Sequence, residues 1–174
     1  PAVRPFPPHP VYTSGSLRPS HVSQQRMDDT VLAHYAAWKQ TYLGSDANGS
    51  FVFYDELKSA TVSEAHGYGM VLAAYMGEQA LFDSMFTFFK AHPSYISQRL
   101  MAWKQKLAGG LMVNVRRASA ATDGDMDIAY ALLLAHVQWG SADAVNYRAE
   151  AMRLLRAILD REVNRTTMTL MVGD

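Results

Sequence analysis

The sequence of 174 residues contains no cysteine. This absence excludes a disulfide framework, zinc sites built from thiolates, and cysteine nucleophiles. Uninterrupted apolar runs are also short. None approaches the roughly eighteen residues of a transmembrane helix, so we expect no membrane-spanning segment. Basic and acidic side chains number 16 each. Without an excess of either charge, the sequence indicates neither a nucleic-acid-binding surface nor an acidic tail.

Motifs for metal or cofactor chemistry are missing as well. The sequence has no phosphate-binding loop, no G-x-S-x-G and no H-E-x-x-H, and its six histidines lack helical metal-ligand spacing. Asp123, Asp125 and Asp127 alternate as in a calcium-binding loop. The sixth and twelfth places of such a loop require Gly and Glu, and here they are Ile128 and Leu134. We therefore expect neither a metal nor a cofactor.

Proline is concentrated at the start of the chain, where six of the seven prolines lie within residues 1–20. Because proline fixes φ and removes a backbone donor, residues 1–22 are predicted to form an extended arm on the domain surface. Residues 23–174 then form the domain. The chain opens on Pro1 and closes on Val172-Gly173-Asp174, from which we expect processing at the front and truncation at the back.

Hydrophobic periodicity predicts helices over about residues 24–42, 61–76, 78–91, 126–139 and 146–163. Ser23 is the expected N-cap of the first helix, and Gly44 and Gly77 are the expected stops of the first and second. The segments at 70–76 and 126–139 are apolar on nearly every side, which predicts burial all round. Such helices alternate with amphipathic ones, so the sequence predicts an all-α domain of two concentric layers with little β-structure.

The expected inward faces can be named for two of these helices. In the first helix they are Val31, Leu32, Tyr35, Trp38 and Tyr42, and in the last helix Tyr147, Ala151, Leu154, Leu155, Ile158 and Leu159. Trp139, at the end of a buried helix, is expected in the core. Trp103 lies in the irregular stretch of residues 94–122, which favours a binding surface.

Two segments place carboxylates at the start of a buried helix. They are residues 61–70, with Glu64, and residues 121–135, with Asp123, Asp125 and Asp127. Carboxylates in a partly desolvated cleft have shifted pKa values and serve in acid–base catalysis. The alternatives are structural. Thr61-x-x-Glu64 also fits a capping box, and the aspartates also complement a helix dipole. A helix starting near Asp123 places Asp123 and Asp127 on one face and Asp125 on another.

Together the two segments resemble glycoside hydrolase family 8. Residues 121–139 fit its A-[ST]-D-[AG]-D-x-x-[IM]-A signature throughout, and residues 63–70 follow Ser-Glu-Gly-Gln-x-Tyr-Gly-Met except at Ala65 and His66. Residues 17–22 and 134–141 resemble the chitosanase-type branch. The resemblance implies an (α/α)6 barrel of six inner and six outer helices, of which this chain supplies roughly the first half.

The resemblance also implies a function. Glu64 would be the general acid and Asp123 would hold the sugar beside the scissile bond, with Tyr68, Trp103, His66 and Asp125 as substrate-binding candidates. The expected activity is that of a secreted, inverting endo-β-1,4-glycanase acting on chitosan, which is slightly favoured, or on β-glucan or cellulose. Its partners would be a polysaccharide and the C-terminal remainder of the same enzyme, which would carry the catalytic base.

Two alternatives remain at this stage. One is a non-catalytic carbohydrate-binding or assembly fragment of such an enzyme. The other is an all-α interaction domain whose acidic residues serve only as helix caps.

Overall fold

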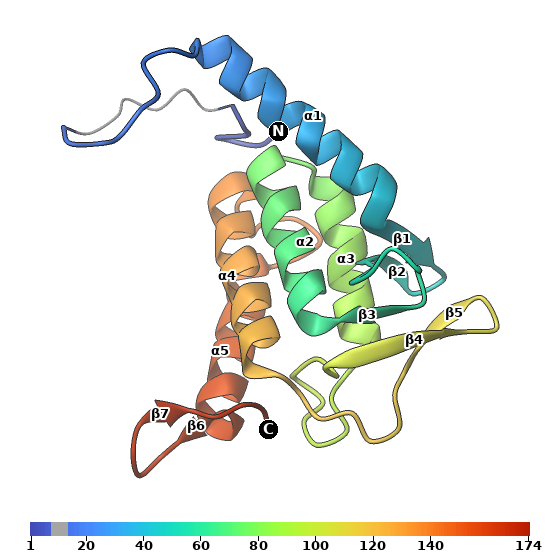
Figure 1. Ribbon diagram of the computed structural model, residues 1–174. Coiled ribbons are helices and arrows are strands. Elements are labelled where there is room, and N and C mark those ends of the chain that lie inside the picture. Colours follow the sequence, from blue (N-terminus) through green and yellow to red (C-terminus); the bar gives the residue numbers. More distant parts are fainter. Residues whose placement is uncertain (8–13) are drawn as a thin grey trace.

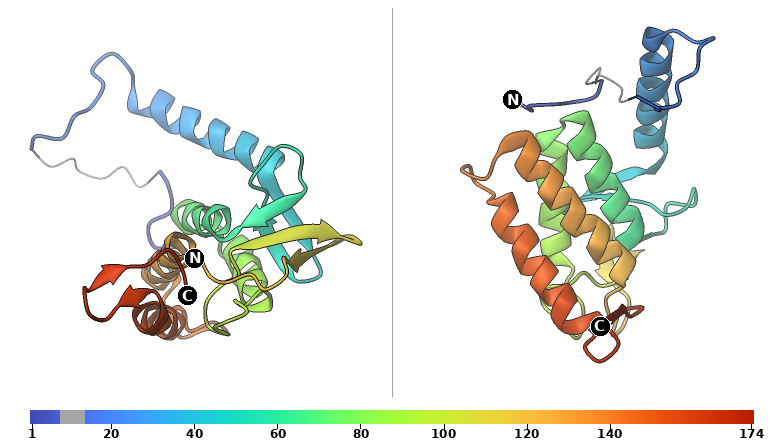
Figure 2. Two further views of the ribbon diagram at one scale, coloured as in Figure 1. Left: turned by 60° about the horizontal axis from the view of Figure 1, so that its bottom comes forward. Right: turned by 90° about the vertical axis from the view of Figure 1, so that its left-hand side faces the viewer.

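The computed structural model of the chain describes residues 1–7 and 14–174. Helices dominate the described part: α1 (Gln24–Tyr42), α2 (Ser63–Met76), α3 (Gln79–Ala91), α4 (Thr122–Trp139) and α5 (Tyr147–Arg161). Helices α2 to α5 form one packed group, in which α2 contacts both α4 and α3, and α4 contacts α5 (Figure 1). Helix α1 lies to one side of this group (Figure 2). None of these helices is long and apolar enough to cross a membrane.

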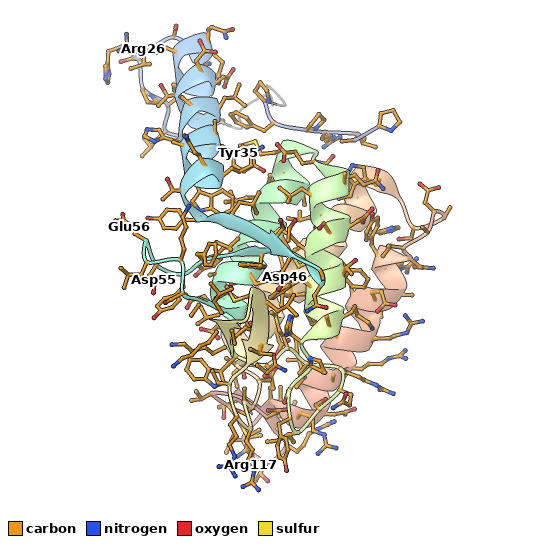
Figure 3. All side chains as sticks on the ribbon, turned by 90° about the vertical axis from the view of Figure 1, so that its right-hand side faces the viewer. Arg26, Tyr35, Asp46, Asp55, Glu56 and Arg117 are labelled. Atoms are coloured by element: carbon orange, nitrogen blue, oxygen red, sulfur yellow. The ribbon has the colours of Figure 1, made fainter. Side chains whose placement is uncertain are left out.

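Short antiparallel strands join the helices. They are β1 (Leu43–Asp46), β2 (Gly49–Val52), β3 (Ala60–Val62), β4 (Lys104–Ala108), β5 (Leu111–Asn114), β6 (Val163–Asn164) and β7 (Thr169–Leu170). Strands β1 and β2 pair, β3, β4 and β5 form a sheet in that order, and β6 pairs with β7. Asp46 lies at the end of β1 (Figure 3). Its carboxylate accepts a hydrogen bond from the Met112 N–H in β5, at 2.7 Å. The fold is thus mainly helical with a minor share of short strands, as predicted.

Two of the three expected signals at the helix ends mark a boundary in the structure. The Ser23 hydroxyl accepts a hydrogen bond from the Arg26 N–H and caps α1, as expected. Gly77 adopts a left-handed conformation, with φ of 73°, and ends α2, as expected. Gly44 does not end α1. The helix stops at Tyr42, because Leu43 already pairs with Val52 in the first hairpin.

The core lies between α2, α3, α4 and α5. Phe82 of α3 is fully buried, and its ring contacts those of Trp139 and Tyr147 edge-on, with centroids 5.4 and 5.5 Å apart. Trp139 is partly buried and packs against the core, in agreement with its expected place.

The predicted burial on every side is not observed. Helices α2 and α4 each leave a row of large side chains exposed: Tyr68 and Tyr75 on α2, and Met126, Tyr130, Leu133 and Val137 on α4. Several residues expected to face inward are also more than a third exposed, namely Val31, Leu32, Leu155 and Leu159. The two concentric layers are therefore not formed by the described residues, and a closed barrel is not seen. Periodicity shows which sides of a helix are apolar, but it does not show whether protein lies against each side.

The first seven residues lie against the C-terminal ends of α2 and α4. The Val3 N–H donates to the Gln138 carbonyl at 3.0 Å, and the Phe6 N–H donates to the Tyr75 carbonyl at 2.8 Å. The Gln138 side chain also bonds to the Arg4 backbone. Two prolines of the predicted arm, Pro8 and Pro10, lie outside the described residues. The division into an arm of residues 1–22 and a domain of residues 23–174 stays a prediction.

Candidate active site

Helices α2 and α4 start side by side, because glycines let their first turns touch. A Cβ at Gly124 would lie 2.3 Å from the Ser63 hydroxyl oxygen, and a Cβ at Gly67 would lie 2.7 Å from the Asp127 Cβ. Distances below 3.0 Å are not tolerated by real Cβ atoms. The two glycines therefore bring the carboxylate-bearing starts of both helices to one place.

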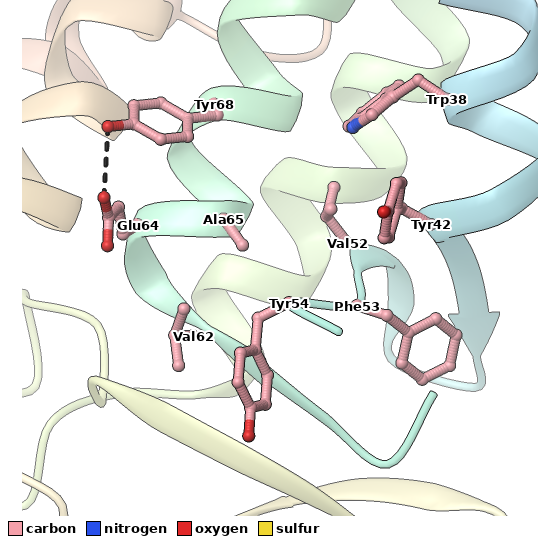
Figure 4. A pocket seen from close by; sticks show the side chains of 9 residues that line it. All are labelled: Trp38, Tyr42, Val52, Phe53, Tyr54, Val62, Glu64, Ala65 and Tyr68. Carbon is pink, nitrogen blue, oxygen red and sulfur yellow. Dashed lines mark hydrogen bonds between the residues drawn. The ribbon is translucent and has the colours of Figure 1, made fainter. Parts of the chain in front are cut away.

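Glu64 lies in the first turn of α2 with its side chain exposed. The Tyr68 hydroxyl, one turn further along, donates a hydrogen bond to Glu64 Oε1 at 3.2 Å (Figure 4). The capping-box alternative is wrong. Thr61 belongs to β3, and its hydroxyl donates to the Val52 carbonyl, while the N-cap of α2 is Val62 and has no side-chain cap. The Glu64 carboxylate is thus left available for other chemistry.

Two open hollows adjoin at Tyr68. The first, of about 360 Å³, is lined by Trp38, Tyr42, Val52, Phe53, Tyr54, Val62, Glu64, Ala65 and Tyr68 (Figure 4). The second, of about 650 Å³, is lined by Tyr68, Ala121, Thr122, Asp123, Met126, Asp127, Leu170, Met171 and Val172. The Glu64–Tyr68 pair therefore stands between an aromatic hollow and an acidic one.

The first hollow is rich in aromatic rings that the sequence did not single out as site residues. Trp38 and Tyr42 of α1 and Phe53 and Tyr54, which follow β2, line the same hollow as Glu64. Flat apolar rings with polar tips suit the apolar faces and hydroxyl edges of sugars. The cluster of aromatic residues at 51–54 was the available signal, but its place beside Glu64 depends on the chain folding back through the β1–β2 hairpin.

Asp123 and Asp127 lie on one face of α4, as predicted, and both line the second hollow. Burial raises the pKa of Asp127, and the neighbouring Asp123 and Glu64 charges raise it further. The pKa of the Tyr68 phenol is raised by its hydrogen bond to Glu64 and by the charges of Glu64, Asp127 and Asp123. Three carboxyl groups and one phenol thus share one electrostatic environment. Asp127 was not among the predicted site residues.

Two predicted substrate-binding residues are in the core instead. His66 is fully buried, its Nε2 lies 3.0 Å from the Met85 carbonyl, and burial lowers its pKa to about 4. Asp125 is also fully buried, its Oδ1 accepts the Met101 N–H at 2.9 Å, and burial raises its pKa well above the ordinary value. Neither side chain reaches the surface where a polysaccharide would bind, so the predictions for His66 and Asp125 are corrected.

Trp103 is 40% exposed and lies at the same end of the molecule as Glu64, because its carbonyl accepts the Ser63 N–H at 3.0 Å. The Lys104 ammonium stands 5.4 Å from the Trp103 ring and 4.9 Å from the Tyr54 ring. The role of Trp103 in substrate binding stays a prediction. Within residues 1–7 and 14–174, no group of three or more His, Cys, Asp or Glu side chains is placed to hold a metal ion.

The chain is similar to several known proteins. The sequence profile of the glycosyl hydrolases family 8 matches residues 8–174. A β-glucanase of Niallia circulans is 45% identical over 176 residues, which cover 98% of this chain and 42% of the relative. An endoglucanase of Bacillus sp. (strain KSM-330) is 36% identical over 171 residues, covering 88% of this chain and 35% of the relative.

Solved structures give the same result for the fold. The apo structure of a β-1,3-1,4-glucanase from Paenibacillus sp. X4 matches with a TM-score of 0.90 and 43% identity, over 98% of this chain and 46% of the other. A cold-adapted family 8 xylanase matches in fold alone, with a TM-score of 0.68 and 20% identity over 92% of this chain and 44% of the other. The chain spans less than half the length of each of these four proteins.

Proposed function

The chain belongs to the glycosyl hydrolases of family 8, and from this we propose that it contributes the acid side of the active site of an endo-acting β-glucanase. The observation that carries the proposal is the meeting of Glu64 and Asp123 at adjacent helix starts, on either side of Tyr68 and beside two open hollows. A chain whose acidic residues only capped helices would have no need of this exposed carboxylate–phenol pair.

Glu64 is proposed as the general acid that protonates the leaving glycosidic oxygen. Its hydrogen bond from Tyr68 holds the carboxyl at the boundary of the two hollows. Asp123 is proposed to hold the sugar beside the scissile bond, since its carboxyl is exposed on the wall of the second hollow. A sugar chain lying across Tyr68 would then present one glycosidic oxygen to Glu64.

An inverting mechanism also requires a base on the opposite face of the sugar, about 6.5–9.5 Å from the acid. Asp127 is poorly suited to this role. Its pKa is raised by burial and by the Asp123 and Glu64 charges, and a general base must be ionised. The relatives continue well beyond the region matched by this chain. We therefore assign the base to that further part of the enzyme, which is also the proposed partner of this half.

β-Glucan is the preferred substrate class in this proposal, since the relatives at 45% and 43% identity are a β-glucanase and a β-1,3-1,4-glucanase. Chitosan is kept as the competing substrate. Polymers of this kind do not enter cells intact, so we propose that the enzyme is secreted.

The test is release of reducing ends from mixed-linkage β-glucan, carboxymethyl-cellulose and chitosan by the protein that carries this chain. Glu64→Gln is expected to lower the rate by about 10²- to 10⁴-fold, the usual contribution of a general acid. The matched control is Glu56→Gln, in the exposed loop at the edge of the molecule (Figure 3), which should keep full activity.

Full activity in Glu64→Gln would overturn the acid assignment. Binding of glucan without release of reducing ends by the unsubstituted protein would instead favour the carbohydrate-binding alternative.

A further inference from the structure

The segment that leads into α4, residues 118–122, is held by the last residues of the chain. The Asp174 carboxylate accepts two hydrogen bonds, from the Ala120 N–H and from the Ser94 hydroxyl, both at 2.6 Å. The Thr122 N–H donates to the Val172 carbonyl at 3.1 Å. The end of the chain lies beside the lower end of α4 in Figure 1. Residues 172–174 therefore contact the backbone immediately before Asp123.

The fit between these two segments is close. A Cβ at Gly173 would lie 2.2 Å from the Ala120 carbonyl oxygen, so only glycine allows the backbones to approach this far. Leu170, Met171 and Val172 continue from this contact as a wall of the second hollow, which also contains Asp123. The terminal segment thus both supports the start of α4 and shapes the space that Asp123 faces.

The other side of residues 118–122 is tied to the loop before β4. The Tyr95 N–H donates to the Ala118 carbonyl at 2.9 Å, and the Trp103 N–H donates to the Ser119 carbonyl at 2.8 Å. On this side, the positions of residues 118 and 119 are determined by backbone bonds. The Ala120 N–H bonds instead to the charged Asp174 carboxylate. Hydrogen bonds to charged groups are stronger than hydrogen bonds between neutral groups.

We propose that Asp174 is a positioning residue that holds residues 118–122 so that the Asp123 carboxylate faces the substrate. This inference rests on the proposed function. Asp174 does not contact the sugar in this scheme. It acts through the backbone at Ala120 and, by its bond to Ser94, joins that backbone to the turn whose N–H groups at Ile96 and Ser97 also bond to the Ser94 oxygen.

The experiment is a double-mutant cycle in the protein that carries this chain, with β-glucan as substrate. Asp174→Ala is expected to lower kcat/KM by about 10- to 100-fold, the usual cost of a misplaced site group. Asp174→Asn should restore most of the activity, since an amide oxygen still accepts the Ala120 N–H. In an Asp123→Asn background, Asp174→Ala should cause little further loss, because the group that it positions has already been changed.

Asp29→Ala, an exposed aspartate on α1 that accepts a hydrogen bond from Gln25, is the control and should not change kcat/KM. Ser94→Ala is a milder variant for the case in which Asp174→Ala does not fold. It removes one of the two Asp174 bonds and should again lose its effect in the Asp123→Asn background.

Equal losses from Asp174→Ala, or from Ser94→Ala, with and without Asp123→Asn would overturn the positioning role and leave the proposed function intact. An unsubstituted protein that releases no sugar from any of the glucans would overturn both.

Discussion

At the residue scale, the environments of the acidic side chains differ more than their spacing suggests. Asp123 and Asp125 are two positions apart, yet Asp123 is exposed on the wall of a hollow and Asp125 is fully buried with its carboxyl on the Met101 N–H. Spacing on a helix predicted that these two side chains point in different directions. The spacing did not predict that the Asp125 side chain points into the core.

Glu162 is another buried acid, located just after α5 and fully enclosed. Burial raises its pKa from 4.5 to about 7. The Thr122 hydroxyl beside it opposes this increase, and the Asp174 and Asp123 charges add to it. Asp125 also lies close enough for its own pKa to be raised by Glu162. Folding therefore favours the protonated form of Glu162.

This predicts a pH dependence of stability. Below about pH 4.5 both the folded and the unfolded chain hold the Glu162 proton. Between about pH 4.5 and 7 only the folded chain holds it, so the free energy of unfolding falls as the pH rises, by about 3 kcal/mol in total, and then levels off. Glu162→Gln removes this contribution and should be more stable than the unsubstituted protein above pH 7, but not at pH 4.

Denaturant unfolding at pH 4, 6 and 8 measures the difference between the two proteins. Asp125 contributes a fall of the same sign to both, and because the Glu162 charge raises the Asp125 pKa, the difference reports on Glu162 together with its coupling to Asp125. A constant difference across the three pH values would show that Glu162 keeps an ordinary pKa.

At the element scale, the site depends on the closest approach of α2 and α4. Replacing a glycine in an exposed helix with alanine usually stabilises the protein, by about 0.5–1 kcal/mol. At Gly67 we expect the opposite sign, a loss of about 1–3 kcal/mol, because the new Cβ would meet the Asp127 Cβ at 2.7 Å and push the helices apart. The reducing-end activity should fall as well, since Glu64 and Asp123 would separate.

Gly69→Ala, in the same helix, is the matched comparison. Its Cβ would meet the ends of the Met85 and Val52 side chains. The Met85 end can move but the branched Val52 side chain is stiff, so stability should fall here as well, while activity should fall less than in Gly67→Ala because the contact does not involve α4. Thermal unfolding and kcat/KM of the two variants test this. A Gly67→Ala protein as stable and active as the unsubstituted one would show that the glycine contact does not set the spacing of the carboxylates.

At the scale of the whole molecule, the structural match with the Paenibacillus sp. X4 glucanase spans 98% of this chain but only 46% of the glucanase. The exposed rows on α2 and α4, with Tyr75 and Tyr130 joined through their hydroxyls at 2.7 Å, form an apolar face of the described residues. Such a face is suited to packing against further helices. This agrees with assigning the catalytic base to the part of the relatives that the chain does not match.

An active site completed in this way should invert the anomeric configuration. Proton NMR during the first minutes of β-glucan hydrolysis, before the products mutarotate, should show new reducing ends in the α form. Glu64→Gln should produce neither anomer at a comparable rate. Initial β products would indicate a retaining mechanism, which needs its two carboxyl groups only about 5–5.5 Å apart. That result would require an ionised carboxylate nucleophile close to Glu64 and would overturn the inverting mechanism.

The sequence by itself determined the family resemblance, the approximate positions of the helices and two of the residues at their ends. These depend on local patterns: the apolar period, the Ser23 cap, the Gly77 stop, and the run of motif residues around Glu64 and Asp123. These features depend on residues that are close together along the chain, so a single sequence is enough to identify them. The Thr61–Glu64 capping box had the right spacing and was still wrong, because β3 pairs with β4 and the Thr61 hydroxyl bonds to Val52 instead.

Only the tertiary structure decided which of the candidate residues line the two hollows and which are buried. His66 and Asp125 are in the core, while Tyr42 and Tyr54 join the hollow beside Glu64. Asp174, fifty-one positions after Asp123, is bonded to the backbone that precedes it. Such contacts join segments that are distant along the chain, and their geometry follows from how the helices and hairpins pack together. The physical reason is that burial and electrostatic environment are properties of all the surrounding chain, and periodicity describes one element at a time.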